Sequence, residues 1–247
     1  MPDLKMAEAA TKPASAEVLS VSDLQAWYGE SHILHGINFN VKAGEVVTLL
    51  GRNGAGKTTT LKSVMGIIGK RTGSIRFNNE NIIRASSDRI ARMGIAFCPE
   101  ERGIFASLDV RENLLLPPVV RSGGLSLDQI FDLFPNLKER LSSQGTKLSG
   151  GEQQMLAIAR ILRTGARFLM LDEPTEGLAP VIIQQIGHTI ARLKSEGFTI
   201  LLVEQNFRFA STVADRYYIV EHGKVIDGFA NSELSANMDK LHTYLGV

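Results

Sequence analysis

Cysteine is nearly absent from this chain of 247 residues, which has only Cys98. One thiol forms neither an intramolecular disulfide nor a cysteine-based zinc site, so disulfide scaffolds and zinc-binding modules are excluded. Long hydrophobic runs are missing as well, because no apolar stretch approaches the ~20 residues that a transmembrane helix needs. Charge of one sign is also not in excess. The 27 Lys and Arg and the 26 Asp and Glu leave a net charge of +1, so nothing electrostatic favours nucleic acid as the main partner.

The composition that remains is that of a folded chain of ordinary size. Apolar residues make up 44% and charged residues 21%, both near the averages for soluble globular proteins, which excludes disorder and collagen-like repeats. At about 150 residues per domain, this length allows one or two domains. Residues 1–17 have no apolar period, and Pro13 lies there among small and polar residues. We expect them to form a flexible N-terminal extension.

Short apolar runs predict the strands of an α/β fold. Residues 46–50, 168–171 and 199–203 are such runs, and a helical pattern that starts at Pro180 separates the last two. This alternation of strand, helix and strand predicts a parallel sheet. Ser87 or Asp88 is expected to cap a short helix. Further strands are expected at residues 18–21, 37–41, 74–77, 95–98, 217–220 and 225–227, with the last two forming a hairpin.

A helical segment interrupts this alternation. No strand-like run appears between Pro99 and Phe168, and amphipathic patterns take over. Asp109 with Glu112 resembles a capping box, and Ser126 precedes a run with apolar residues at helical spacing. We therefore expect a helical part inserted into the α/β core.

A glycine-rich loop follows the first buried run. Residues 51–58 read Gly-Arg-Asn-Gly-Ala-Gly-Lys-Thr and fit G-x-x-x-x-G-K-[ST] between a strand and a helix. Glycines let successive backbone N–H groups point at a phosphate, and the helix N-terminus adds partial positive charge. Lys57 would neutralise the β- and γ-phosphates, and the Thr58 hydroxyl would bind Mg²⁺. The full match leaves little support for a glycine turn with a chance lysine. The candidate phosphate-binding residues are Gly51, Asn53, Gly54, Ala55, Gly56, Lys57, Thr58 and Thr59.

Two adjacent carboxylates end another buried run. Asp172 and Glu173 follow residues 168–171 at the carboxyl edge, where open parallel sheets bind ligands. Asp172 would hold Mg²⁺, and Glu173 would accept a proton from the attacking water or orient it. Taken alone, the pair is explained equally well as an acidic strand end that caps the next turn. The glycine-rich loop in the same chain favours the catalytic interpretation.

A second candidate anion site opens the helical pattern at residues 155–162. Ser149, Gly150 and Gly151 stand at its start, where backbone N–H groups are free to bind an anion. A Ser N-cap followed by flexible glycines explains the same residues without a ligand.

In this order along the chain, the three motifs resemble those of the nucleotide-binding subunits of ATP-binding cassette (ABC) transporters. Residues 148–154 resemble that family's signature sequence, and the resemblance covers residues 18–228. Four shorter segments look like the ATPases of branched-chain amino-acid importers, with the importers of urea and short amides as close neighbours. These segments are Tyr28-Gly29, Cys98–Arg102, Glu173–Pro180 and Leu202–Asn206.

The resemblance implies the ABC ATPase form of the P-loop NTPase fold. Its core would be a mixed or parallel sheet, with an antiparallel β part at the N-terminus. A helical subdomain of approximately residues 101–164 would be inserted into a single domain of residues 18–247. The resemblance also implies a pair of ATPase subunits, identical or related, with ATP between the glycine-rich loop of one and the signature of the other.

Residue roles are implied by the same resemblance. Tyr28 would stack on adenine, although packing beside Trp27 is the ordinary alternative. Glu173 and Gln205 would be catalytic, and Glu100 would join Thr58 and Asp172 at Mg²⁺. The residues that would contact nucleotide on the opposite subunit are Ser149, Gly150, Gly151 and Glu152.

Three positions depart from the general pattern of the superfamily. Glu100 stands where most members have glutamine, Ala179 where aspartate is usual, and Gln205 where a histidine usually contacts the γ-phosphate. All three are familiar in the branched-chain group, and they put the catalytic rate in doubt. Gln205 can donate through its amide but cannot carry a histidinium's charge. Glu100 would either place a further carboxylate near Mg²⁺ or be a solvated loop acid.

The predicted function is therefore ATP hydrolysis that powers uptake of branched-chain or related amino acids. The partners would be transmembrane permease subunits, a second ATPase subunit and, indirectly, a solute-binding protein, with no nucleic acid. The chain would lie at the cytoplasmic face of the cell (inner) membrane, held there by the permeases. The alternatives are a urea or amide importer, a nucleotide-gated module with little turnover, and an ABC ATPase that acts on nucleic acid or ribosomes.

Overall fold

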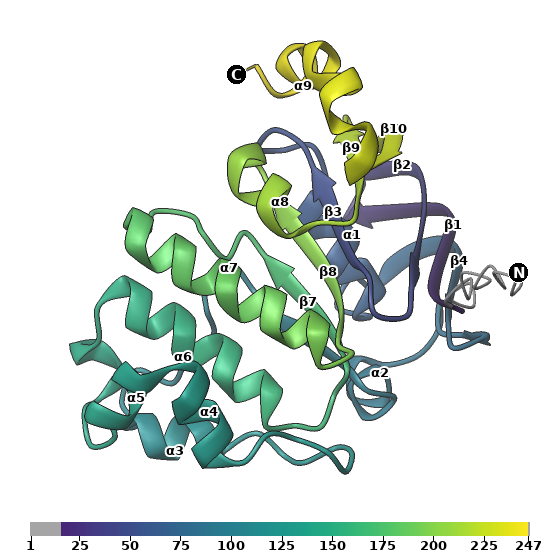
Figure 1. The fold of residues 1–247 in the computed structure, drawn as a ribbon. Coiled ribbons are helices and arrows are strands. Elements are labelled where there is room, and N and C mark those ends of the chain that lie inside the picture. Colours follow the sequence, from purple (N-terminus) through teal and green to yellow (C-terminus); the bar gives the residue numbers. More distant parts are fainter. Residues whose placement is uncertain (1–15, 247) are drawn as a thin grey trace, which may run out of the picture.

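The computed structural model describes residues 16–246 and contains two sheets flanked by helices (Figure 1). The first is a four-stranded antiparallel sheet in the order β2-β1-β4-β5, and the second is a six-stranded sheet in the order β10-β9-β3-β8-β7-β6. The predicted α/β fold, with an antiparallel part first and a mixed sheet core, is confirmed. The predicted extension at residues 1–17 lies outside the described residues except for its last two, and β1 already begins at Glu17.

The antiparallel sheet is longer than the sequence predicted. Its strands are β1 (Glu17–Tyr28), β2 (Ser31–Lys42), β4 (Lys70–Phe77) and β5 (Glu80–Asn81). The register of β1 against β2 shifts between Val21 and Leu24, where Asp23 has a φ of 47°. Such a bulge breaks the alternation of apolar and polar residues, which is why the pattern indicated only the first part of β1.

The six-stranded sheet brings the expected polar strand ends to one edge. β3 (Val46–Leu50), β6 (Ile95–Cys98), β7 (Phe168–Asp172), β8 (Thr199–Glu204) and β9 (Arg216–Glu221) are parallel, and β10 (Lys224–Ala230) pairs with β9 as the predicted hairpin. Leu50 lies opposite Glu204, and Asp172 opposite Val203. The segments that follow β3, β6, β7 and β8 therefore start side by side.

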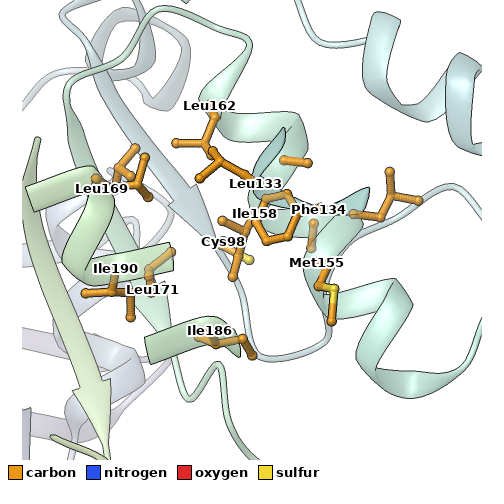
Figure 2. Packing of buried hydrophobic residues seen from close by; sticks show 14 of the residues in the cluster. Cys98, Leu133, Phe134, Met155, Ile158, Leu162, Leu169, Leu171, Ile186 and Ile190 are labelled. Carbon is orange, nitrogen blue, oxygen red and sulfur yellow. The ribbon is translucent and has the colours of Figure 1, made fainter. Parts of the chain in front are cut away.

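The helical segment between β6 and β7 consists of α3 (Val110–Leu115), α4 (Leu127–Leu133), α5 (Pro135–Glu139), the 3₁₀ turn η1 (Gly145–Lys147) and α6 (Gly150–Leu162). Both predicted N-caps are present, with capping boxes at Asp109 and Ser126. Met155 and Ile158 of α6 belong to one cluster of buried side chains with Phe134 and the sheet residue Leu171 (Figure 2). Through α6, the helical segment thus shares a hydrophobic core with the sheet.

The remaining helices follow β3, β5, β7, β8 and β10 along the chain. They are α1 (Lys57–Val64), α2 (Ser87–Arg92), α7 (Pro180–Ser195), α8 (Phe207–Val213), η2 (Asn231–Asn237) and α9 (Met238–Leu245). The N-cap of α2 is Ser86, because its backbone is extended whereas Ser87 is already helical, so the predicted caps Ser87 and Asp88 were wrong by one and two residues. Leu241 and Leu245 of α9 are buried in a cluster with Leu50, just before the glycine-rich loop. Within residues 16–246, no helix has the length and apolar content needed to cross a bilayer.

Candidate functional site

A cleft of about 400 Å³ lies over the loop between β3 and α1. Its walls come from segments far apart in the sequence, because Tyr28 ends β1, Glu100 follows β6 and Glu173 follows β7. Ten of the sequence-predicted site residues line it together with Ile33: Tyr28, Asn53, Gly54, Ala55, Gly56, Lys57, Thr58, Thr59, Glu100 and Glu173. The cleft is open to solvent and has the size of a small-molecule site.

The backbone of residues 51–56 needs its glycines. Gly54 and Gly56 have φ values of 81° and 105°, in the left-handed region that side chains rarely adopt. A Cβ at Gly51 would lie 2.3 Å from the Val220 carbonyl oxygen of β9. The loop is therefore wound tightly above the sheet, directly before α1.

Lys57 is buried and already paired. Its Nζ lies 3.0 Å from Oε1 of Glu173 and donates to the carbonyl oxygens of Gly51 (2.8 Å) and Arg52 (3.1 Å). Only 4% of Lys57 and 7% of Glu173 are exposed. A buried ammonium requires such compensation, and the two residues predicted to act on the phosphates and on water thus hold each other.

Asp172 and Thr58 form an oxygen-rich corner beside this pair. The Thr58 hydroxyl donates to Oδ1 of Asp172 at 3.0 Å, while Oδ2 is buried and has no hydrogen-bond partner. Burial raises the pKa of Asp172 to about 6, and the charges of Glu173 and Glu100 add to this. An unsatisfied buried carboxylate oxygen next to a hydroxyl is a fitting ligand pair for a hard cation such as Mg²⁺.

The protein alone supplies few ligands to such a cation. Among the described residues, no group of three or more His, Cys, Asp or Glu side chains could hold a metal ion. Phosphate and water oxygens would have to complete its coordination, as is common for Mg²⁺. Glu100 is exposed and lines the cleft. This position is compatible both with a further carboxylate near Mg²⁺ and with a solvated loop acid.

Tyr28 lies at the edge of the cleft with 49% of its surface exposed. Trp27 stacks on His32, with ring centroids 4.3 Å apart. The partner of Trp27 is therefore His32, and the Tyr28 ring is accessible from the cleft.

Gln205 lies next to the glycine-rich loop but outside the cleft. It borders a neighbouring pocket of about 380 Å³ with Gly51, Arg52, Asn53, Asn206 and Leu245. The structure therefore brings Gln205 to the loop, on the side covered by α9, without placing it beside Glu100.

The signature residues lie apart from the cleft. Ser149 is the N-cap of α6 and forms a capping box with Glu152, which explains these two side chains without a bound anion. None of residues 149–152 is among the residues that line the cleft in the described chain. Gly151 packs against α7, where an added Cβ would lie 2.8 Å from a side-chain carbon of Ile182. A role for these residues at a nucleotide thus needs a second subunit.

Two buried polar residues at the same sheet edge, Thr175 and Glu204, were not predicted from the sequence. The Thr175 hydroxyl donates to Oε1 of Glu204 at 2.8 Å, and the backbone N–H of Asn206 donates to Oε2 at 3.3 Å. Burial raises the pKa of Glu204 to about 7 against the effect of these donors, and the Glu173 charge raises it further. The signal that could have revealed Glu204 is a carboxylate that ends the apolar run of residues 199–203.

This carboxyl predicts a pH-dependent stability. Below pH ~7 Glu204 is protonated in the folded protein, whereas in the unfolded chain it stays ionised down to pH ~4.5. The folded state then binds more protons, so stability rises as the pH falls through this window and is lost again above it. Between pH 8 and pH 6 the gain should be about 1 kcal/mol, or ~2–4 °C in melting temperature.

The measurement is thermal unfolding of the nucleotide-free chain at both pH values. Glu204→Gln, which cannot ionise, should show a smaller difference between pH 6 and pH 8 than the parent. An equal difference in both proteins would contradict the assignment.

Comparison with known proteins agrees with this geometry. The family described as "ABC transporter" matches residues 34–176. The chain is 42% identical over 232 residues to the high-affinity branched-chain amino acid transport ATP-binding protein BraG of Pseudomonas aeruginosa, covering 93% of this chain and 100% of BraG. It is 34% identical over 234 residues to the lipopolysaccharide export system ATP-binding protein LptB of Escherichia coli K12, covering 92% and 97%.

A solved structure described as the ATP binding subunit of an ABC transporter superimposes with a TM-score of 0.77 at 28% identity, covering 93% of this chain and 100% of that one. The family match spans more than half of the chain, and both relatives align over nearly its whole length. This chain therefore belongs to the ABC transporter family, as one of its ATP-binding ATPase subunits.

Proposed function

We propose that this chain hydrolyses Mg–ATP in the cleft to power uptake of branched-chain or related amino acids. The main support for the ATPase site is that four side chains meet in the cleft as two pairs. Lys57 pairs with Glu173, and Thr58 is hydrogen-bonded to Asp172. The solute class is supported by the similarity to BraG, a branched-chain amino acid transport ATP-binding protein, and by the segments that resemble branched-chain importers.

Each side chain in the cleft has a matching task. Lys57 provides the counter-charge for the β- and γ-phosphates, and the exposed Tyr28 ring offers a face for adenine. Thr58 and Asp172 hold Mg²⁺, which neutralises charge that develops on the phosphate oxygens. Glu173 orients the attacking water and accepts its proton.

The pair of Lys57 and Glu173 makes this base dependent on ATP. While Lys57 lies 3.0 Å from Oε1 of Glu173, the carboxylate is held by the ammonium. Phosphates that bind the Lys57 ammonium would release the carboxylate. Binding of the nucleotide thus prepares the base at the position where water must be activated.

A second ATPase subunit supplies what this chain's cleft lacks. Ser149, Gly150, Gly151 and Glu152 lie at the start of α6 and do not line the cleft, so they would contact ATP held by the opposite subunit. Closure on ATP and opening after hydrolysis would be a two-state switch driven by ligand. A nucleotide-gated module with little turnover differs only in that phosphate release is negligible.

Permease subunits would hold this chain at the cytoplasmic face of the membrane, and an external solute-binding protein would deliver the solute to them. Phe105, Leu115 and Leu116 are about half exposed near the helical segment, whereas Leu114 is buried in the core. These three side chains and Val119, which is 65% exposed, are therefore available to a permease.

The test is purification from native membranes in mild detergent, using tagged full-length chain with Glu173→Gln and Mg–ATP. We expect two multi-span permeases and an ATPase subunit by mass spectrometry, and uptake assays with leucine and with urea then separate the solute classes. Recovery of only soluble partners or nucleic acid would contradict the transport function. Phosphate release by the complex with Glu173 intact separates an ATPase from a gated module.

A further inference from the structure

The loops that carry Glu173 and Gln205 meet at one buried carboxylate. Thr175 lies two residues after Glu173, and Glu204 lies directly before Gln205. The Thr175 hydroxyl and Oε1 of Glu204 are 2.8 Å apart, and both residues are buried, with 4% and 1% exposed. This is a side-chain link between the two segments that follow β7 and β8.

The second oxygen of the same carboxylate closes a turn around Gln205. Oε2 of Glu204 accepts from the backbone N–H of Asn206 at 3.3 Å, and Asn206 in turn caps α8 through its Oδ1 and the N–H of Phe209. Gln205 therefore lies between Glu204, which supplies the carboxylate, and Asn206, whose N–H donates to that carboxylate. Its backbone position depends on both.

Glu173 is held by the same pair of strands. Its N–H donates to the carbonyl oxygen of Val203 at 2.9 Å, and its φ of 44° lies in the left-handed region that glutamate rarely adopts. Such a conformation persists only where neighbouring contacts impose it. The Val203 bond and the Thr175 bond act on either side of the turn at Glu173.

Stability alone is a poor explanation for a carboxylate at this position. Taking a carboxylate out of water is costly, and an apolar pair of similar volume would fill the space without that cost. A carboxylate differs from an apolar side chain in accepting two hydrogen bonds in separate directions. Here the two directions lead to the segments of Glu173 and of Gln205.

We infer that Glu204 is a positioning residue which, through Thr175 and Asn206, holds Glu173 and Gln205 in the mutual arrangement that ATP hydrolysis requires. This inference rests on the proposed ATPase site. Glu204 touches no substrate and acts only through these two loops. Loss of the link should misplace the base relative to the attacking water, which lowers the rate of the chemical step more than the affinity for ATP.

The test is kcat and KM for Mg–ATP, measured by phosphate release with the full-length chain in the complex purified from membranes, at one protein concentration. Thr175→Val removes the hydroxyl at nearly constant volume, and Glu204→Ala removes the carboxylate. Both should lower kcat about tenfold and leave KM within about twofold. Thr175→Ser and Glu204→Gln keep hydrogen-bonding groups at these positions and should stay within about threefold of the parent.

Thr189→Val is the matched control. Thr189 is also 4% exposed, and its hydroxyl donates only within α7, to the Gln185 carbonyl oxygen at 2.9 Å. Thr189→Val should lower the melting temperature but leave kcat unchanged. The double variant Thr175→Val with Glu204→Ala should be no slower than Glu204→Ala alone, because Glu204→Ala already removes the hydrogen bond to Thr175.

An unchanged kcat in Thr175→Val would overturn the inference. An equal loss of kcat in Thr189→Val would overturn it as well. If Glu204→Ala does not fold, the result for Thr175→Val is decisive. Glu173→Gln, assayed alongside, separates the two proposals. If that variant loses activity while Thr175→Val does not, only the link is wrong. If Glu173→Gln hydrolyses ATP like the parent, the proposed catalytic site itself is wrong.

Discussion

Glu173→Gln is expected to lower kcat for ATP hydrolysis by about 100-fold or more while ATP binding persists. The amide can still hydrogen-bond a water but accepts no proton. With hydrolysis blocked, two ATP-bound subunits should remain closed on each other. Phosphate release measures the first effect, and size-exclusion chromatography in saturating Mg–ATP measures the second.

The structure adds a signature that a simple loss of base would lack. Glu173 is the carboxylate partner of the buried Lys57 ammonium, so the nucleotide-free variant should melt at a lower temperature than the parent. ATP phosphates replace that partner, and saturating Mg–ATP should therefore raise the melting temperature of the variant more than that of the parent. Glu196→Gln, which removes an exposed carboxylate in an ion pair with Arg192, serves as control. A monomeric Glu173→Gln protein in saturating Mg–ATP would contradict the prediction.

Lys57→Ala should weaken ATP binding by about 100-fold or more, which abolishes it at ordinary assay concentrations. Two effects act together. The phosphates lose their counter-charge, and the Glu173 carboxylate, now without its partner at 3.0 Å, repels them. Isothermal titration with Mg–ATP measures the affinity, and an unchanged value would sink this prediction.

Two further variants resolve these effects. Lys62→Ala removes a cation from the same helix, where Lys62 lies 4.0 Å from the exposed Glu101, and should change the affinity only a few-fold. The double variant Lys57→Ala with Glu173→Gln should recover part of the affinity lost in Lys57→Ala, because the unpaired carboxylate is gone. No recovery would mean that repulsion from Glu173 contributes little.

Local sequence patterns were sufficient where one short segment decides the structure. The loop of residues 51–58 is predictable because glycine alone tolerates the backbone at Gly54 and Gly56. The caps at Asp109, Ser126 and Ser149 are predictable because a capping box needs only two residues three apart. Short, mostly apolar runs indicated β3, β7 and β8, because a strand that is buried on both faces has apolar residues at successive positions.

Patterns failed where contacts between distant segments decide the structure. The bulge after Val21 hid most of β1, because it shifts which residues face the core. The cover of α9 over Leu50 and the glycine-rich loop rests on Leu241 and Leu245, whose partners lie far away in the sequence. No local rule connects such residues.

The sequence by itself determined the chemistry of this protein: a phosphate loop, a pair of carboxylates at the end of a strand, and a helical insertion between them. Only the tertiary structure decided how these groups are paired. The contacts of Lys57 with Glu173 and of Thr175 with Glu204 span 116 and 29 positions along the chain. Parallel strands bring their carboxyl ends to one edge, and burial there makes every charge require a partner. Such pairing follows from which strands are neighbours, which residue types and spacings within one segment do not specify.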